Sequence, residues 1–394
     1  MSSRPVGYHT RRALVLLAVL CGAAALAACS AGPAPAPRPS GFAPADVAAV
    51  DAAAGAALTD GATGAIVAVS DPRRGTLLKA YGTADTGGEP LTPDASYRIA
   101  SVTKTFTADA VLRLVDQRRV ALADPVAKYV PDLPNGDRIT VRDLLAMRSG
   151  VYDFADDQAF FARYTADPAY PGWTPADALA IMRAHAAEFT APDRQTVYCN
   201  SNYVLLGYVI EKATGEPADR ALDGVARRLE LRGTFYPSGT TLPAPFVHGY
   251  LGDGTPPAPG IAEQPHRDVT VSNPAVAGTA GAIVSTVPDM ARYAAALGTG
   301  AGLSPAMWQQ RQTWSPLSTS GVRLEYGLGI TRVGDWIGHD GSIFGYSNMV
   351  FYLPSERAAV VVMSNVADEI AVPSQNLFGE VVKRLYPGSL TTWP

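Results

Sequence analysis

A serine and a lysine three residues apart, Ser101 and Lys104, lie where a strand-like segment, residues 97–100, gives way to a helix expected to end near Asp116. Residues i and i+3 share one face of a helix, so the hydroxyl and the ammonium should point into the same space. The free N–H groups at a helix N-terminus would stabilise an oxyanion if Ser101 attacked a carbonyl group. Taken alone, the pair has a second interpretation, a capping serine followed by a solvated lysine.

Two more polar clusters follow in the chain. The first is Tyr198-Cys199-Asn200, directly before an apolar run, residues 203–213, that Gly215 would end as a helix. The second is His339-Asp340-Gly341-Ser342, ahead of a strand-like run, residues 347–352. A tyrosine is a poor base until a nearby cation lowers its pKa, and an ammonium about 4 Å away would lower it by about three units at most. Lys104 could therefore activate Tyr198, and which of the two is the immediate base stays open.

In this order and spacing the three clusters resemble the Ser-x-x-Lys, Tyr-x-Asn and Lys/His-x-Gly motifs of the penicillin-recognising serine hydrolases. Tyrosine in the second motif and histidine in the third are similar to the branch with class C β-lactamases, D-alanyl-D-alanine carboxypeptidases and esterases. The similarity covers about residues 45–390, with further matches at residues 101–107, 144–152, 198–215, 281–292 and 326–329. The resemblance implies an α+β, β-lactamase/transpeptidase-like fold. In that fold an antiparallel sheet from the N- and C-terminal segments is flanked by helices and carries an inserted helical lobe.

The resemblance also implies roles for the remaining site residues. Asn200 would hold Lys104 on one side and a substrate amide on the other. His339 would line the cleft opposite Tyr198 and relay protons, or bind a carboxylate when charged near its ordinary pKa of about 6.5. Gly341 would let substrate lie against the strand, and the N–H of Ser342 would complete an oxyanion hole with that of Ser101. No metal or nucleotide cofactor is expected.

One departure from the family pattern concerns recognition of a carboxylate. Relatives that cleave D-alanine peptides often place an arginine just after the Tyr-Gly-x-Gly-x run. Here Thr331 follows Ile330 and Arg332 comes one residue later, so strand alternation would turn the guanidinium to the opposite face. Carboxylate recognition is therefore in doubt.

The N-terminal segment predicts export. Residues 1–28 hold three arginines and no acid, and the uncharged run at residues 13–28 is shorter than the roughly 20 residues that span a bilayer. Leu26-Ala27-Ala28-Cys29 matches a lipoprotein cleavage site, with lipidation at Cys29 and anchoring to the outer face of a bacterial cytoplasmic membrane. An ordinary signal peptide containing a cysteine is the alternative. Arg11-Arg12 leaves Sec or Tat export undecided.

The expected organisation is a signal peptide at 1–28, a proline-rich tether at 29–41 and a hydrolase domain at 42–394. Within that domain, the sheet lobe would comprise about 42–100 and 275–394, and the helical lobe about 101–274. Beyond residue 28 there are 29 basic and 36 acidic side chains, which argues against a nucleic-acid partner.

The sequence thus predicts an exported serine hydrolase that works through an acyl-enzyme. Its first expected substrates are D-alanyl peptides of peptidoglycan, then β-lactams, then small esters. The alternative from another class is a non-catalytic penicillin-binding or peptidoglycan-sensing lipoprotein.

Overall fold

Strands from the two ends of the chain form one antiparallel sheet in the computed structural model, which describes residues 39–189, 195–252, 266–317, 323–367 and 373–390. The sheet has eight strands in the order β2-β1-β11-β10-β9-β8-β7-β6. Their bounds are β1 Gly64–Asp71, β2 Gly75–Gly82, β6 Ser315–Leu317, β7 Leu324–Tyr326, β8 Thr331–Val333, β9 Trp336–Ile343, β10 Tyr346–Leu353 and β11 Ala358–Ser364. Shorter pairs join β3 Tyr97–Arg98 to β5 Val284–Ser285 and β4 Tyr250–Leu251 to β12 Val366–Ala367.

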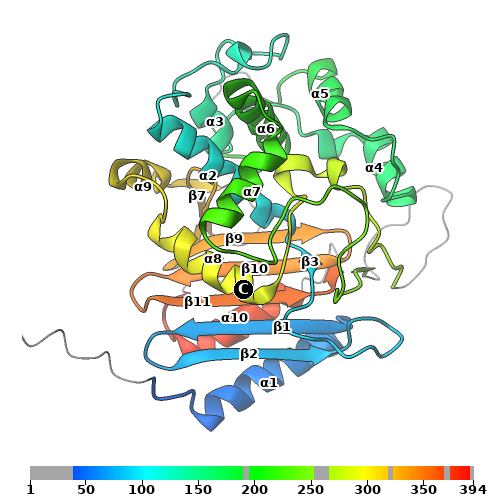
Figure 1. Cartoon of the computed structure of the whole chain (residues 1–394), viewed down its shortest axis with the longest axis vertical. Helices are drawn as coiled ribbons and strands as arrows, with labels where there is room; N and C mark the ends of the chain where they lie inside the picture. The colour runs from blue at the N-terminus through cyan, green and yellow to red at the C-terminus, as the bar shows by residue number, and fades with distance from the viewer. Residues whose placement is uncertain (1–38, 190–194, 253–265, 318–322, 368–372, 391–394) are drawn as a thin grey trace, which may run out of the picture. The chain divides into compact units, whose positions relative to one another are not determined.

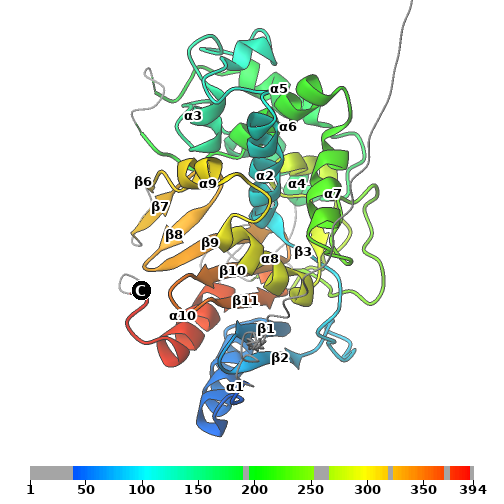
Figure 2. The same cartoon turned by 60° about the vertical axis from the view of Figure 1, so that its left-hand side comes forward.

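The central strands are apolar on both faces because helices cover each side. On one face Val67, Met349 and Val362 pack with α1 Pro44–Thr59 and α10 Pro373–Leu385. On the other face the neighbouring residues pack against α8 Val287–Thr299. Alternate side chains of a strand point to opposite faces, which explains why adjacent residues join different apolar clusters. Figures 1 and 2 show α1 and α10 together on one side and α8 on the other.

The middle of the chain supplies a group of helices beside the sheet. Their bounds are α2 Thr103–Asp116, α3 Val141–Leu145, α4 Gln158–Ala166, α5 Pro175–Ala184, α6 Ser201–Thr214 and α7 Ala218–Arg228, and α9 Pro305–Arg311 follows α8. Helix α2 is buried over most of its length and packs against α6 and α7. Figure 2 shows α2 running from this group of helices toward the sheet.

Buried contacts of Arg98 connect the strand before Ser101 to the rest of the fold. The Arg98 guanidinium donates hydrogen bonds to the carbonyl groups of Thr240, Thr270 and Ser272. Its own carbonyl oxygen accepts from the side chain of Asn348 on β10, 3.1 Å away. The segment that leads into the nucleophile is therefore tied both to two loops and to the central sheet.

The predicted fold class is confirmed, with two local differences. A glycine after an apolar run often marks the end of a helix, but α8 continues past Gly298 to Thr299 and is capped by Gly300 in the left-handed conformation. Residue 298 lies inside the helix and is a glycine because a side chain there would collide with Tyr352. The segment around His339 is part of β9, although no strand was expected there. It contains two glycines and an aspartate, residue types that are depleted in strands, so the sequence did not indicate one.

Candidate active site

The serine at the centre of the site lies in a short 3-10 turn, Ala100–Val102, directly before α2. Ala100 has a positive φ of 52°, an uncommon conformation for a residue with a side chain. The turn is fixed from outside, since Ile99 N–H donates to the carbonyl of Ile283 and the Ile283 N–H donates to the Thr103 hydroxyl. Ser101 is thus held on a strained turn at the start of a buried helix.

Lys104 has no exposure to solvent, and its amino nitrogen is surrounded by three oxygen atoms. Nζ lies 2.9 Å from the Ser101 hydroxyl, 2.8 Å from Oδ1 of Asn200 and 2.9 Å from the carbonyl oxygen of Ala280. The predicted proximity of Ser101 and Lys104 is therefore present. The three contacts come from the turn before α2, the start of α6 and the turn before β5.

These contacts suit a neutral amine as well as an ammonium. The amide oxygen of Asn200 and the carbonyl of Ala280 can only accept, so they take two N–H groups of Lys104. The lone pair of a neutral amine would then face the Ser101 hydroxyl, which is where a general base must accept its proton. Burial lowers the pKa of Lys104 to about 7, although the negative charges of Asp153 and Asp340 act in the opposite direction. A substantial fraction of neutral amine is therefore present near pH 7.

Asn200 is oriented by an aspartate that the sequence analysis did not identify. The carboxylate of buried Asp153 accepts both the backbone N–H of Asn200, at 2.7 Å, and its side-chain amide, at 3.0 Å. Because the amide NH₂ faces Asp153, the amide oxygen must face Lys104. Asn200 directly precedes α6 but does not cap it through its side chain, since the structure shows no such hydrogen bond.

Tyr198 lies beside the lysine, with the Lys104 nitrogen 4.9 Å from its ring centre. Loss of water around the hydroxyl and the nearby Asp340 charge raise the pKa of Tyr198 well above its ordinary value, and a hydrogen bond with Ser101 offsets this only in part. The expectation that Lys104 makes Tyr198 an effective base by lowering its pKa is wrong on this point. Burial depends on the tertiary structure and outweighs the single cation considered from the sequence.

His339 is close to Tyr198, but it is fully buried and is not among the residues that line the cavity beside Ser101. Its Nδ1 lies 2.5 Å from the carbonyl of Asp340 and its Nε2 3.1 Å from the hydroxyl of Tyr326. Burial lowers the pKa of His339 below its ordinary value, with Lys104 adding to the effect and Asp340 opposing it. The expected charge near pH 6.5, and with it a carboxylate contact, does not fit these surroundings.

Gly341 brings the second half of β9 against the nucleophile turn. A Cβ atom at this position would lie 2.5 Å from the Ile99 carbonyl oxygen and 3.1 Å from the backbone nitrogen of Ser101. Its observed contact is therefore with the protein backbone, whereas the sequence analysis expected contact with substrate. In the described structure β8 pairs with β9 only up to Gly338, so the following residues of β9 have no partner strand on that edge. Ser342 on this segment is exposed at the cavity.

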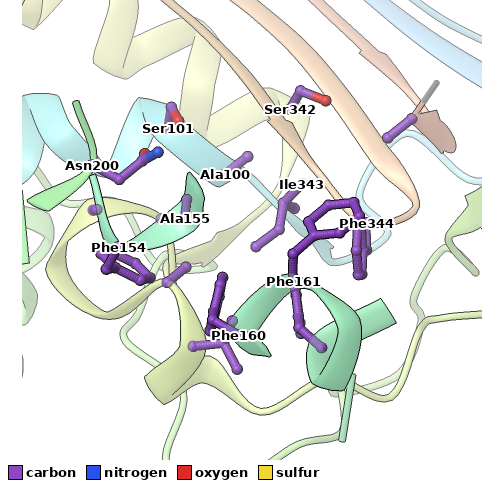
Figure 3. Close-up of a pocket in the computed structure, with 16 residues that line it drawn as sticks. Ala100, Ser101, Phe154, Ala155, Phe160, Phe161, Asn200, Ser342, Ile343 and Phe344 are labelled. Atoms are coloured by element: carbon purple, nitrogen blue, oxygen red, sulfur yellow. The ribbon is translucent and has the colours of Figure 1, made fainter. Parts of the chain in front are cut away.

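A cavity of about 280 Å³ opens beside Ser101. Figure 3 shows Ser101, Asn200 and Ser342 on one side of it and the rings of Phe160, Phe161 and Phe344 on the other. The other lining residues are Ala100, Phe154, Ala155, Tyr164, Val276, Ala277, Ala280, Gly281, Ile343 and Ala367. Tyr164 stacks on Phe344 at 4.2 Å and 9°, which joins α4 to the turn after β9. Within the described part of the chain, no charged side chain lines this cavity.

The arginine considered as a carboxylate ligand is used elsewhere. Arg332 donates to Glu325 at 2.7 Å and its guanidinium lies 4.8 Å from the ring centre of Trp314. Thr331 is buried and donates to the carbonyl of Gly338. The doubt about carboxylate recognition is thus consistent with the geometry. Over the described ranges there is also no group of three or more His, Cys, Asp or Glu side chains placed to hold a metal ion.

Three parts of this site were not predicted from the sequence. Asp153 carried a weak signal, because it directly follows the matching segment 144–152. The aromatic side chains of α4 at positions 160 and 164 follow helical spacing, which would also suit an ordinary core. The carbonyl of Ala280 had no signal, since every residue has a carbonyl group.

A family model described as Beta-lactamase matches residues 49–376, which is most of the chain. The chain belongs to the β-lactamase family. It is therefore a serine hydrolase of the group that includes penicillin-binding proteins, as the predicted motifs indicated.

Relatives of this β-lactamase family member have several activities. A D-stereospecific amidohydrolase from Streptomyces sp. is 31% identical, with a TM-score of 0.75, over 86% of this chain and 98% of that one. The putative penicillin-binding protein PbpX of Bacillus subtilis is 25% identical over 78% of this chain and 70% of its own length. The unguisins hydrolase ungD' of Aspergillus campestris is 30% identical over 74% of this chain, which spans 56% of that protein.

In this β-lactamase family site, we predict that Gly341→Ala lowers kcat strongly and the free energy of unfolding only moderately. The added methyl group would push β9 away from the nucleophile turn, costing about 1–3 kcal/mol of unfolding free energy and at least about tenfold in kcat, since small misplacements are costly. Gly55→Ala is the matched control, because nothing lies within 4 Å of that position on α1. Thermal unfolding and the rate of serine acylation would be measured for both, and equal acylation rates would refute the role of Gly341.

Proposed function

We propose that this chain is a serine amidohydrolase that forms an acyl-enzyme at Ser101 and cleaves amides of D-amino acids with large apolar side chains. The observation that carries the proposal is the apolar, aromatic cavity beside the Ser101–Lys104 pair. The first predicted substrates, peptides with a free terminal carboxylate, need a cation, which the described lining does not supply. The D-stereospecific amidohydrolase from Streptomyces supports the amide and the D-configuration.

In the proposed mechanism, Ser101 Oγ attacks the amide carbon while its proton passes to the neutral amine of Lys104. The N–H groups of Ser101 and Ser342 would bind the oxyanion. The C–N bond then breaks and the leaving amine takes a proton, which the Tyr198 hydroxyl can pass on because it stays protonated. Water then attacks the ester of the acyl-enzyme, and the proton transfers run in the reverse order. This step releases the free acid and restores Ser101.

The cavity favours a substrate with one large apolar group. Phe154, Phe160, Phe161 and Phe344 surround a volume large enough for an aromatic side chain. Burial of such a side chain would contribute about 1.5–3 kcal/mol to binding. A terminal carboxylate placed against these rings would lose water without gaining a partner.

A panel of three substrates tests this proposal. We expect D-phenylalanine amide to be hydrolysed with a kcat/KM at least about tenfold above that of a D-Ala-D-Ala peptide or a chromogenic cephalosporin, because only the first combines an aromatic group with a neutral leaving group. Ser101→Ala should abolish turnover and labelling by a fluorophosphonate probe. L-Phenylalanine amide serves as the stereochemical control.

Preference for the D-Ala-D-Ala peptide would instead establish the carboxypeptidase function predicted first from the sequence. Preference for the cephalosporin would establish a β-lactamase. Fluorophosphonate labelling that survives Ser101→Ala would refute the nucleophile itself, and turnover of none of the substrates together with no labelling would favour the non-catalytic alternative.

The lysine should give acylation a defined pH dependence. The acting base is neutral Lys104, so the acylation rate should rise about tenfold per pH unit below pH 7 and level off above it. The rate of fluorophosphonate labelling between pH 5 and pH 9 measures this without a choice of substrate. Lys104→Arg should label far more slowly at every pH, because arginine stays charged. A rate that falls with rising pH would contradict Lys104 as the base.

We also propose that Cys29 anchors the protein to the membrane. Leu26-Ala27-Ala28-Cys29 and the proline-rich segment after it support this proposal, and they lie outside the described residues except for residues 39–41. Of the helices that the structure describes, none has the length and apolar character needed to cross a membrane. An attached acyl chain contributes about 0.8 kcal/mol per buried CH₂.

We expect Cys29→Ser to move the chain from the membrane fraction of the expressing cells to the soluble fraction. Mass spectrometry of the N-terminal peptide should show lipid on the wild type alone. Cys199→Ser is the control, because that thiol is buried near Val151 in the folded unit. A wild-type chain without lipid and with unchanged fractionation would reject the anchor.

A further inference from the structure

Two tyrosines and a histidine form a buried polar chain behind the catalytic residues. His339 on β9, Tyr326 on β7 and Tyr203 on α6 each have no solvent exposure. The Tyr326 hydroxyl lies 3.1 Å from Nε2 of His339 and 3.5 Å from the hydroxyl of Tyr203. Tyr203 in turn donates to the carbonyl of Leu145 at 3.0 Å. Tyr326 is thus the middle member of the chain.

The contacts determine where the protons are. The carbonyl of Asp340 can only accept, so Nδ1 of His339 must carry a hydrogen. A neutral imidazole then has its lone pair on Nε2. The single proton of the Tyr326 hydroxyl has two acceptors within reach, Nε2 at 3.1 Å and the Tyr203 oxygen at 3.5 Å, and the shorter contact favours Nε2. The Tyr203 hydroxyl has already given its own proton to Leu145 and cannot supply this bond. Tyr326 is therefore the group that satisfies Nε2.

The chain also lies close to Tyr198. The ring centres of Tyr326 and His339 lie 6.3 Å and 6.2 Å from that of Tyr198, with the Tyr326 ring almost perpendicular to it. Lys104 contacts the same group, with its nitrogen 4.9 Å from the Tyr198 ring and 5.9 Å from the Tyr203 ring. A charge on His339 would therefore act on both residues that handle the Ser101 proton.

We propose that Tyr326 is a positioning residue for catalysis, which holds His339 as the neutral Nδ1–H tautomer and so keeps a second positive charge away from Lys104. A hydrogen bond donated to the imidazole lone pair stabilises the uncharged form. The other charges that act on His339 are those of Asp340, which favours protonation, and of Lys104 and Arg311, which oppose it. Burial acts in the same direction as Tyr326.

The proposal rests on the proposed hydrolase function for its catalytic part. Without the Tyr326 hydroxyl, the neutral form of His339 would lose the hydrogen bond that stabilises its Nε2 lone pair. The pKa of His339 would then rise. Below that pKa, the imidazolium would disfavour the ammonium form of Lys104, which lowers the pKa of the amine and weakens it as a base.

Tyr326→Phe tests the catalytic part. We expect kcat on D-phenylalanine amide, or the maximal labelling rate of the fluorophosphonate, to fall about 10- to 100-fold while KM stays within about twofold. The acid side of the pH profile, which reports the pKa of Lys104, should also move to lower pH. Tyr293→Phe is the matched control, a buried tyrosine whose hydroxyl contacts Thr105 outside this chain of residues, and it should change neither quantity. An unchanged kcat and pH profile in Tyr326→Phe would overturn the proposal.

A second measurement needs no turnover and observes the wild-type chain directly. Nitrogen-15 spectra of the full chain labelled at histidine, with the His339 signals assigned by their loss in His339→Gln, should show the Nδ1–H tautomer of the wild type at pH 7. An imidazolium or an Nε2–H tautomer would overturn the proposal. A chain that showed this tautomer but hydrolysed no substrate and took up no probe would contradict the proposed function and leave the Tyr326–His339 contact established.

Discussion

Burial of the Lys104 amino group is the constraint on which the rest of the site depends. An amine without water must have its hydrogen-bonding groups paired, and its partners come from three segments that lie far apart in the chain. Asn200 can act as one of them only because Asp153 holds its amide. The same burial lowers the pKa of the lysine to about 7, so the environment that holds Lys104 in place also makes it a base near neutral pH.

The sheet contributes to the site by approaching the nucleophile very closely. Strand β9 passes against the turn that carries Ser101, and only a glycine at position 341 allows this separation. The same strand carries His339 into the interior and Ser342 to the cavity, as the alternation of a strand requires. One strand thus joins the buried polar chain, the nucleophile and the cavity, which explains why residues far apart in the sequence act together.

The sequence was sufficient to predict features set by local spacing. Ser101 and Lys104 meet as their i, i+3 spacing requires, and the helix before Gly215 ends in the left-handed conformation that glycine permits. The pKa directions of Tyr198 and His339 differ from those expected from the sequence, because they follow from burial by elements far apart in the chain. The acceptor at Ala280 could not be predicted at all, since a backbone carbonyl leaves no mark on the residue type.

The same electrostatics relate the substrate to the base. An anion about 8 Å from Lys104 would stabilise its ammonium by about 2 kcal/mol at an effective dielectric of about 20, which is about 1.5 pKa units. Asp153 and Asp340 already act in this direction. A substrate carboxylate in the cavity would therefore reduce the neutral amine present at pH 7 by more than tenfold. A charged His339 would have the opposite effect, because it would lower the pKa of Lys104 and weaken it as a base. An apolar cavity and an uncharged His339 avoid both effects, so the aromatic lining and the buried polar chain act on the same base from two sides.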